Sequence, residues 1–291
     1  MTIREVADLL RLKERKIYEL VAHKQIPCTR VSGKWLFPRQ QIDSWLAQNS
    51  EYQCDSALRK PVPPVVVGSH DPLLEWALGE MGFPFSLQVN GSTEGLNRFA
   101  AGNAVICGIH LLDPDSGEHN VPMVKSLLGQ ADIVLIEWAH REQGLVLAPG
   151  NPLGIHELAD LKETKARVIE RQEGAGSRIL FAHLLAEVGL NRENLTILPQ
   201  PARSHNDVGF AICCGQADAG LAVYAIARQM RLEFLPLSRE RFDLVIRRRD
   251  YFEPTFQQLL LFAHTAQFRD KASEMGGYDL ADFGKVHYNG P

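Results

Sequence analysis

Runs rich in β-branched residues alternate with helical segments from residue 64 onward, and this pattern constrains the fold most strongly. The helical segments include residues 177–188 and 205–215. The β-prone runs occur at residues 64–68, 103–110, 131–138, 144–149, 166–171 and 195–199. Strands that alternate with helices form a mainly parallel sheet with helices on its faces. The pattern therefore predicts an α/β fold for this part of the chain.

The alternation does not extend to the residues before 64. The segment 50–64, SEYQCDSALRKPVPP, has weak apolar periodicity and ends with three prolines within four residues. Such a composition is typical of a linker. We therefore expect a small domain over residues 1–49, a linker over residues 50–64 and a larger domain over residues 65–291.

The first 49 residues have the periodicities of three helices and a hairpin. In chain order the expected elements are a helix over 3–10, a helix over 13–24, two β-prone runs at 26–31 and 34–37, and a closing helix with Ile42, Trp45 and Leu46 on its apolar side. The turn signal Ser32-Gly33 separates the two β-prone runs. This order of elements is that of a winged helix-turn-helix, whose second helix enters the major groove of DNA.

Charge is distributed unevenly between the two parts. Residues 1–49 contain nine Lys and Arg against five Asp and Glu, whereas the whole chain has a net charge of −4. A basic head on an acidic body is expected when one domain binds a polyanion and the other has a different role. The distribution therefore predicts double-stranded DNA as the partner of the first domain.

Residues 2–46 resemble the excisionase/MerR-type winged helix-turn-helix domain along their whole length, notably in the motifs EVADLL, IYELV, GKWLFP and IDSWL. The resemblance implies that residues 13–24 form the recognition helix. It also implies DNA contacts from Arg15, Lys16, Tyr18, Lys24, Arg30 and Lys34. Lys13 and Lys16 stand where this family usually has Ser or Thr, so the bases that are read stay open.

The larger domain has four strand-to-helix turns that are rich in small polar residues. Asp71 is placed to cap a helix that begins at Pro72, and Ser204 with Asp207 forms the S-x-x-D pattern of a capping box. The other two turns have the sequences NGSTEG and EGAGSR. Helix N-termini that converge present unpaired N–H groups and form a site for an anion.

These turns, with GLVLAPGNPLGIHELADLK and GQADAGLAVYAIARQMRLEFLPL, resemble the periplasmic-binding-protein-like domain of the molybdate/tungstate type over residues 65–250. The resemblance implies two α/β lobes that close on a ligand. Its boundaries are residues 65–138 with 238–291 for one lobe and 144–235 for the other, with crossings at 138–143 and 235–237. Its ligand-binding residues are Ser69, Ser92, Thr93, Gly176, Ser177 and Tyr224.

Several charged residues near these turns leave the kind of anion open. Arg171, Arg178 and Arg203 lie in the candidate loops, and a guanidinium fork suits a carboxylate or a phosphate ester better than a small spherical oxyanion. We therefore include Arg171 and Arg178 among the expected ligand-binding residues. Asp71 and Glu94 would repel an anion unless they point away from it. A small organic anion, such as a molybdenum-cofactor intermediate, is therefore an alternative ligand to molybdate and tungstate.

Motifs of enzymes and of metal sites are absent from the sequence. It has no G-x-S-x-G, Walker loop, H-E-x-x-H or nucleotide-binding G-x-G-x-x-G. The pair Cys213 and Cys214 ends an apolar helix and predicts buried packing, and His110 after a strand predicts a hydrogen-bonded residue at the rim of a cleft. We therefore expect no catalytic residues, no metal site and no cofactor.

Targeting signals and cysteine usage predict a cytoplasmic protein. The first residues lack the apolar core of a signal peptide, and no stretch approaches the roughly 18 apolar residues of a membrane span. Five cysteines without a C-x-x-C motif fit neither a disulfide framework nor a zinc site.

The combined hypothesis is a one-component transcriptional regulator: a two-lobed, periplasmic-binding-protein-like α/β domain preceded by a small winged helix-turn-helix domain. Molybdate or tungstate is its first expected ligand. We expect a homodimer, because one short recognition helix and a wing make few contacts. The alternative from another class is a cofactor-assembly enzyme or factor whose first domain serves as a tether.

Overall fold

The computed structural model describes residues 1–23, 25–31, 33–48, 62–82, 85–113 and 116–291. The chain folds as two compact units, Met1–Val62 and Pro63–Pro291. Residues 50–61 of the expected linker lie outside the described ranges. Among the residues that the structure describes, no helix is both long and apolar enough to cross a membrane.

The first unit has the predicted order of elements. Its helices and strands are α1 (Ile3–Leu10), α2 (Glu14–Ala22), β1 (Thr29–Val31), β2 (Lys34–Leu36) and α3 (Arg39–Gln48). Thr2 and Glu5 form a capping box at the start of α1, whereas Lys13 at the start of α2 makes no side-chain cap. The strands β1 and β2 pair antiparallel, and Gly33 in the turn has a φ of +81° that favours glycine.

A small apolar core holds these elements together. Val6 of α1, Ile17 of α2, Phe37 after β2 and Ile42 of α3 are fully buried in it, and Trp45 packs against them. The expectation that Leu46 belongs to the covered side of the closing helix is wrong, because its side chain is 40% exposed.

The second unit contains one ten-stranded sheet in the order β4-β3-β5-β10-β6-β9-β7-β8, with β11 and β12 paired to β6. The strands are β3 (Val65–Gly68), β4 (Ser86–Val89), β5 (Ile106–Ile109), β6 (Ile133–Leu147), β7 (Arg167–Ile169), β8 (Thr196–Ile197), β9 (Ala219–Val223), β10 (Glu233–Arg247), β11 (Tyr278–Asp279) and β12 (Val286–Asn289). The sheet is parallel at both ends, where β4, β3 and β5 pair and where β8, β7 and β9 pair. Its centre is antiparallel, because β10 pairs with β5 and β6, and β6 pairs with β9. The expected mainly parallel sheet is therefore correct only at the two ends.

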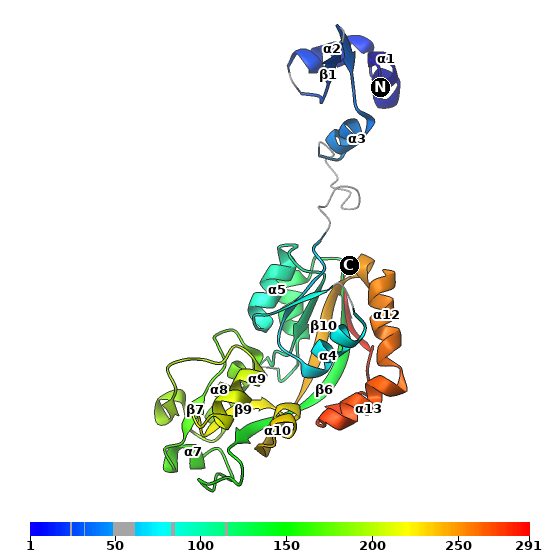
Figure 1. Ribbon diagram of the computed structural model, residues 1–291. Helices are drawn as coiled ribbons and strands as arrows, with labels where there is room; N and C mark the ends of the chain where they lie inside the picture. Colours follow the sequence, from blue (N-terminus) through cyan, green and yellow to red (C-terminus); the bar gives the residue numbers. More distant parts are fainter. Residues whose placement is uncertain (24, 32, 49–61, 83–84, 114–115) are drawn as a thin grey trace. The chain divides into compact units, whose positions relative to one another are not determined.

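The long strands β6 and β10 form a two-stranded ribbon that runs through both lobes (Figure 1). Two separate strands, 131–138 and 144–149, were expected here, with a crossing between them. The apolar pattern of the sequence is interrupted by the polar residues His140, Arg141 and Gln143. In the structure these residues pair with β10 and continue β6 without interruption. The second expected crossing, 235–237, lies inside β10 at a register shift.

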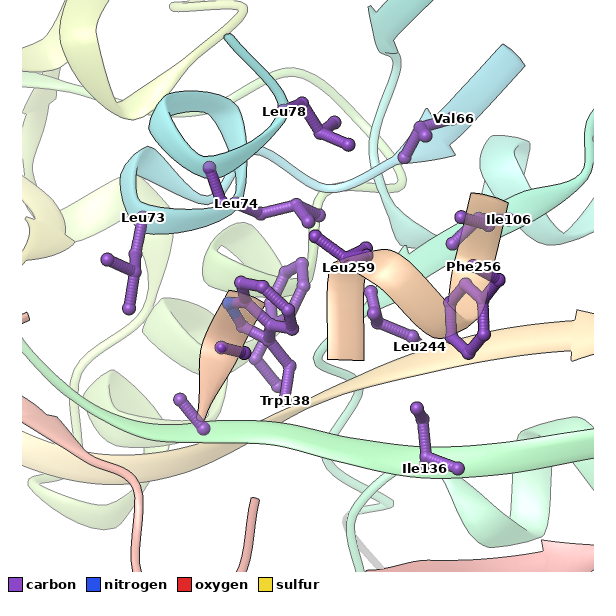
Figure 2. Packing of buried hydrophobic residues seen from close by; sticks show 14 of the residues in the cluster. Val66, Leu73, Leu74, Leu78, Ile106, Ile136, Trp138, Leu244, Phe256 and Leu259 are labelled. Carbon is purple, nitrogen blue, oxygen red and sulfur yellow. The ribbon is translucent and has the colours of Figure 1, made fainter. Parts of the chain in front are cut away.

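The first lobe packs two groups of helices on opposite faces of its half of the sheet. One apolar cluster lies under α4 (Pro72–Glu80), α12 (Pro254–Ala263) and α13 (Ala266–Met275), and Figure 2 shows Trp138, Leu244 and Leu259 inside it. A second cluster lies under α5 (Ser92–Ala100) and α6 (Val121–Leu128) on the other face. The short helix α11 (Arg248–Tyr251) follows β10.

The second lobe repeats this arrangement on its own half of the sheet. One cluster includes residues of α7 (Asp160–Glu163) and α8 (Gly176–Glu187), and the other includes residues of α9 (His205–Cys213) and α10 (Tyr224–Met230). A 3-10 turn covers Arg192–Asn194. The helices expected near 177–188 and 205–215 are thus confirmed within a few residues.

Candidate functional site

Buried polar side chains gather where the two lobes meet. They follow the carboxyl ends of β3, β5 and β7, begin α5, α8 and α9, or lie in the middle of the β6–β10 ribbon. We call them the interlobe cluster: Ser69, His70, Asp71, Ser92, His110, Arg141, Gln143, Arg171, Ser177, His205 and Glu240. Ligand sites of α/β folds lie at such strand ends.

The hydroxyl groups from the first lobe bind each other. Ser69 Oγ lies 2.7 Å from Ser92 Oγ, and Ser92 Oγ accepts a hydrogen bond from the His110 backbone N–H at 3.2 Å. The Ser69 backbone N–H donates to the Gly108 carbonyl oxygen at 2.8 Å. Both hydroxyl oxygens therefore have partners within the lobe.

Arg141 stands between two buried carboxylates. Its Nη1 donates to Asp71 Oδ2 at 3.0 Å and to the His70 carbonyl oxygen at 3.1 Å, and its Nε donates to Glu240 Oε1 at 3.0 Å. Burial disfavours the charged guanidinium, but Glu240 and Asp71 outweigh it and raise the pKa of Arg141. The guanidinium is thus held by protein carboxylates.

Besides Arg141, the Asp71 carboxylate binds three donors of the protein. Its carboxylate accepts from the Leu74 N–H at 2.7 Å as the cap of α4, from Trp138 Nε1 at 2.9 Å and from the Tyr278 hydroxyl at 2.9 Å. The predicted capping role is confirmed. Glu94, the other carboxylate beside the expected anion, is exposed.

Glu240 connects Arg141 with His110. Its Oε2 lies 2.6 Å from His110 Nδ1, and Gln143 Nε2 lies 3.4 Å from the same nitrogen. Burial raises the pKa of Glu240, but Arg141 and His110 outweigh that effect and lower it to about 2. Burial also lowers the pKa of His110, which is hydrogen-bonded as expected but buried and not at a rim.

Arg171 is the buried cation of the second lobe. Its Nη2 donates to the Arg203 carbonyl oxygen at 2.9 Å, and its Nε lies 3.4 Å from Gln172 Oε1. Burial lowers its pKa to about 10. Within the described ranges, neither Arg171 Nη1 nor Ser177 Oγ has a hydrogen-bond partner, although both atoms are buried.

His205, at the first position of α9, lies between two histidines of the first lobe. Its ring centroid is 5.9 Å from that of His70 and 6.2 Å from that of His110. Burial and then the neighbouring Arg171 and Arg141 lower the pKa of His205 well below its ordinary value, so the ring is neutral at pH 7. Both ring nitrogens are buried and have no partner among the described residues.

The start of α5 approaches the start of α8 at the edge of the cluster. The Thr93 N–H donates to the Gly174 carbonyl oxygen at 3.4 Å. A Cβ atom at Gly176 would collide with the His110 backbone oxygen, and one at Gly91 would lie 3.1 Å from the Gly174 oxygen. Glycine at these positions therefore allows the two helix N-termini to approach closely.

The structure brings some of the predicted ligand residues together and leaves others apart. Ser69, Ser92, Arg171 and Ser177 belong to the interlobe cluster, and Thr93 and Gly176 lie at the contact between the helix starts. Arg178 is half-buried in the first turn of α8. Tyr224 packs on Phe234 with ring centroids 5.1 Å apart and lies against Gly276 and Gly277.

Arg141, Gln143 and Glu240 were not among the predicted site residues. Arg141 and Gln143 lie in the expected crossing 138–143, whereas Glu240 lies 99 residues after Arg141 in a segment that was assigned to the first lobe. The sequence contained a signal for one continuous strand: polar residues follow the apolar run 133–138 directly and are themselves followed by the apolar run that begins at Leu145.

An open cleft of about 610 Å³ lies beside the cluster. Its lining comes from α4, α9, α10 and α13: Pro72, Glu75, Trp76, Asn206, Ala225, Arg228, Gln229, Lys271, Glu274 and Met275. Glu75 Oε2 lies 3.0 Å from His70 Nε2, and Asn206 follows His205. The cleft therefore adjoins the cluster at His70 and His205.

The first unit presents most of its predicted DNA-binding residues to solvent. Arg15 is 91% and Lys16 57% exposed in their side chains, and both pair with Glu19 on the same face of α2. Tyr18 is 52% exposed. Arg30 lies over the Trp35 ring at 5.4 Å, and Lys34 is exposed in β2. Lys24 lies outside the described residues.

Metal-ligating side chains do not cluster in the part of the chain that the structure describes, which contains no group of three or more His, Cys, Asp and Glu able to hold an ion. The expectation that Cys213 and Cys214 are buried is wrong, because both are exposed at the end of α9. The helix turns its apolar side, with Val208 and Ile212, toward the sheet instead.

Comparison with known proteins gives the same two parts. Residues 1–50 match the model of a helix-turn-helix domain, and residues 77–264 match the model of a PBP superfamily domain. The uncharacterized protein YvgK of Bacillus subtilis is 26% identical over 302 residues, which cover 98% of this chain and 96% of that protein.

Solved structures share the fold at low sequence identity. A putative phosphate ABC transporter substrate-binding protein from Clostridium perfringens, with bound phosphate, has a TM-score of 0.55 at 12% identity and covers 72% of this chain and 96% of its own. A hydrogen-peroxide-bound mutant of OxyR from Corynebacterium glutamicum has a TM-score of 0.51 at 13% identity and covers 94% and 89%. The domains resemble binding and regulatory proteins rather than enzymes.

The PBP superfamily model spans more than half of the chain, and the two-lobed sheet has the fold of binding proteins. A helix-turn-helix domain precedes it. The chain therefore belongs to the family of proteins with a PBP superfamily domain, here joined to an N-terminal helix-turn-helix domain.

Proposed function

We propose that this protein is a one-component transcriptional regulator of the cytoplasm. Its first unit binds double-stranded DNA, and its two-lobed unit binds a small anion in the interlobe cluster. The observation that carries the proposal is Arg171 Nη1, a buried donor without a hydrogen-bond partner among the described residues, in a chain that also has a helix-turn-helix domain. A buried guanidinium without a carboxylate partner is costly unless a ligand anion compensates its charge.

Two kinds of anion follow from the residues. Molybdate or tungstate is the ligand that the resemblance to the molybdate/tungstate-type domain implies, and hydroxyl and amide donors at helix N-termini suit a tetrahedral oxyanion. A small organic anion, including a molybdenum-cofactor intermediate, suits the planar guanidinium of Arg171 better. Calorimetry with molybdate, tungstate, sulfate, phosphate and small carboxylates tests the proposed site. The absence of binding by every anion would contradict it.

DNA binding should depend on the cations of α2 and the hairpin. With a duplex selected from a random library by the full-length protein, the affinity should fall with salt with a slope of about −0.9 per phosphate contact. Arg15→Ala and Lys34→Ala should each reduce that slope by about one unit. Lys162→Ala, an exposed cation of the second unit, is the matched control and should leave the slope unchanged.

The regulator should act as a homodimer. Two recognition helices that read half-sites about 34 Å or a multiple of it apart give the affinity that one short helix lacks. Ligand and DNA should then affect each other's affinity by the same factor, because coupling between two binding sites is reciprocal. Sedimentation of the protein with and without duplex DNA tests the dimer, and a complex of one chain per duplex would contradict it.

A further inference from the structure

The interlobe cluster contains hydrogen-bond acceptors as well as donors, and the acceptors restrict the ligand. The amide nitrogen Nε2 of Gln143 lies 3.4 Å from His110 Nδ1, which in turn lies 2.6 Å from Glu240 Oε2. The amide oxygen Oε1 of Gln143 is therefore the atom that is left to accept a hydrogen bond from a ligand. This oxygen is buried and has no partner within the described ranges. An amide oxygen can only accept a hydrogen bond.

His205 adds a second acceptor. Its ring is fully buried, with its centroid 5.9 Å from that of His70 and 6.2 Å from that of His110, and the nearby Arg171 and Arg141 disfavour a positive charge on it. The Glu240 carboxylate is engaged by Arg141 and His110. A neutral imidazole has one N–H and one nitrogen lone pair. The two unpartnered nitrogens of His205 are therefore one donor and one acceptor.

The donors of the cluster are Arg171 Nη1, the N–H of His205 and the hydroxyl of Ser177, which can also accept. A fully deprotonated oxyanion has acceptors alone. It would satisfy these donors but would bring oxygen lone pairs against Gln143 Oε1 and the His205 lone pair. A buried acceptor that stays unpaired costs free energy.

The charges of the cluster favour a single negative charge on the ligand. Asp71 and Glu240 both form ion pairs with Arg141. Arg171 has no ion pair with a carboxylate among the described residues, so its guanidinium can receive a carboxylate of the ligand. The two arginines and the two carboxylates of the cluster already sum to zero charge, so a dianion would leave a larger negative excess than a monoanion.

On the basis of the proposed function, we infer that the ligand is a small hydroxylated monocarboxylate, whose carboxylate binds Arg171 and Ser177 and whose hydroxyl donates to Gln143 or His205. The carboxylate supplies acceptors for the donors of the second lobe, and the hydroxyl supplies the donor that the amide oxygen or the imidazole lone pair requires. Molybdate, tungstate and sulfate lack that donor.

Calorimetry on the full-length protein at pH 7.5 with matched pairs of anions tests this inference. The pairs are glycolate with acetate, lactate with propionate and malate with succinate, and molybdate, tungstate, sulfate and phosphate are titrated beside them. The hydroxylated monocarboxylates should bind at least about tenfold more tightly than their deoxy partners, because a site built around a substrate hydroxyl rejects the analogue that lacks it. Malate, a dianion, should bind more weakly than lactate.

The variant Gln143→Met locates the recognition of the hydroxyl. It should reduce the preference for the hydroxylated member of each pair and leave the affinity for the deoxy member nearly unchanged. Gln216→Met, at an exposed position after α9 and outside the cleft lining, is the matched control. If Gln143→Met does not fold, titration of the paired anions on the unaltered protein still tests whether the ligand carries a hydroxyl.

The outcomes separate the inference from the proposed function. Tightest binding by molybdate or tungstate, or equal binding within every pair, would overturn the hydroxylated ligand but keep the anion sensor. Tight binding by phosphate or malate would overturn the single charge. Failure of every anion to bind would contradict the anion-sensing function itself.

Discussion

The two lobes contribute to the interlobe cluster in opposite ways. In the first lobe, the hydroxyls of Ser69 and Ser92 bind each other and the His110 backbone. In the second lobe, Arg171 Nη1, Ser177 Oγ and the ring of His205 have no partner among the residues that the structure describes. We infer that the second lobe carries most of the groups whose hydrogen bonds a ligand completes, whereas the first-lobe part of the cluster has one buried unpartnered atom among the described residues, His70 Nδ1.

The largest effect is expected from Arg171→Met. Loss of a charge-assisted hydrogen bond should weaken anion binding by about 1.5 to 3 kcal/mol. The melting temperature without added anion should stay the same or rise, because the variant removes a buried cation that burial disfavours. Calorimetry and thermal unfolding measure the two effects. Arg249→Met, which removes an exposed cation of α11, is the control, and an equal loss of affinity there would show that the effect is not specific to Arg171.

The second prediction compares a serine that should affect stability with a serine that should affect anion affinity. Ser92→Ala should lower the free energy of unfolding by about 1 to 3 kcal/mol, because the His110 N–H and the Ser69 hydroxyl lose a buried partner. Ser177→Ala in the second lobe should leave stability unchanged and lower anion affinity by about 0.5 to 1.5 kcal/mol. Denaturant unfolding beside calorimetry distinguishes the two. A Ser92→Ala protein of unaltered stability would remove the distinction between the lobes.

The third prediction uses the neutral state of His205. Its folded pKa lies below its unfolded pKa, so only the unfolded chain takes up this proton as the pH falls below about 6.5. Stability should therefore fall with decreasing pH, by up to about 1.4 kcal/mol per pH unit from this group. His205→Gln should reduce that slope, measured by denaturant unfolding between pH 7 and pH 5. His183→Gln, a partly exposed histidine of α8, should not, and an unchanged slope in His205→Gln would contradict the neutral ring.

Local features of the sequence were predictable, and contacts between distant segments were not. The cap at Asp71 and the capping box of Ser204 and Asp207 were predicted correctly because each depends on residues within one turn. The pairing of Arg141 with Glu240 was missed, because it depends on the register of two strands about a hundred residues apart.

The sequence was also unable to show which side chains of a correctly predicted helix are buried. Apolar periodicity placed α9 correctly, but it could not show that the sheet contacts the face with Val208 and that Cys213 and Cys214 end the helix in solvent. Resemblance placed Ser92 and Ser177 near one another without revealing that Ser92 is already paired. Which donors are engaged depends on the packed structure.

The β6–β10 ribbon has a mechanical consequence. Its two register shifts, at Pro236/Ser238 and at Phe242/Asp243, enclose residues 238–242, which pair with the stretch of β6 that contains Arg141 and Gln143. Because continuous strands join the lobes at this point, a rotation of one lobe against the other must change the twist of these two strands. Arg141, Gln143 and Glu240 lie on the twisted segment itself, so a force on these side chains acts directly on the angle between the lobes.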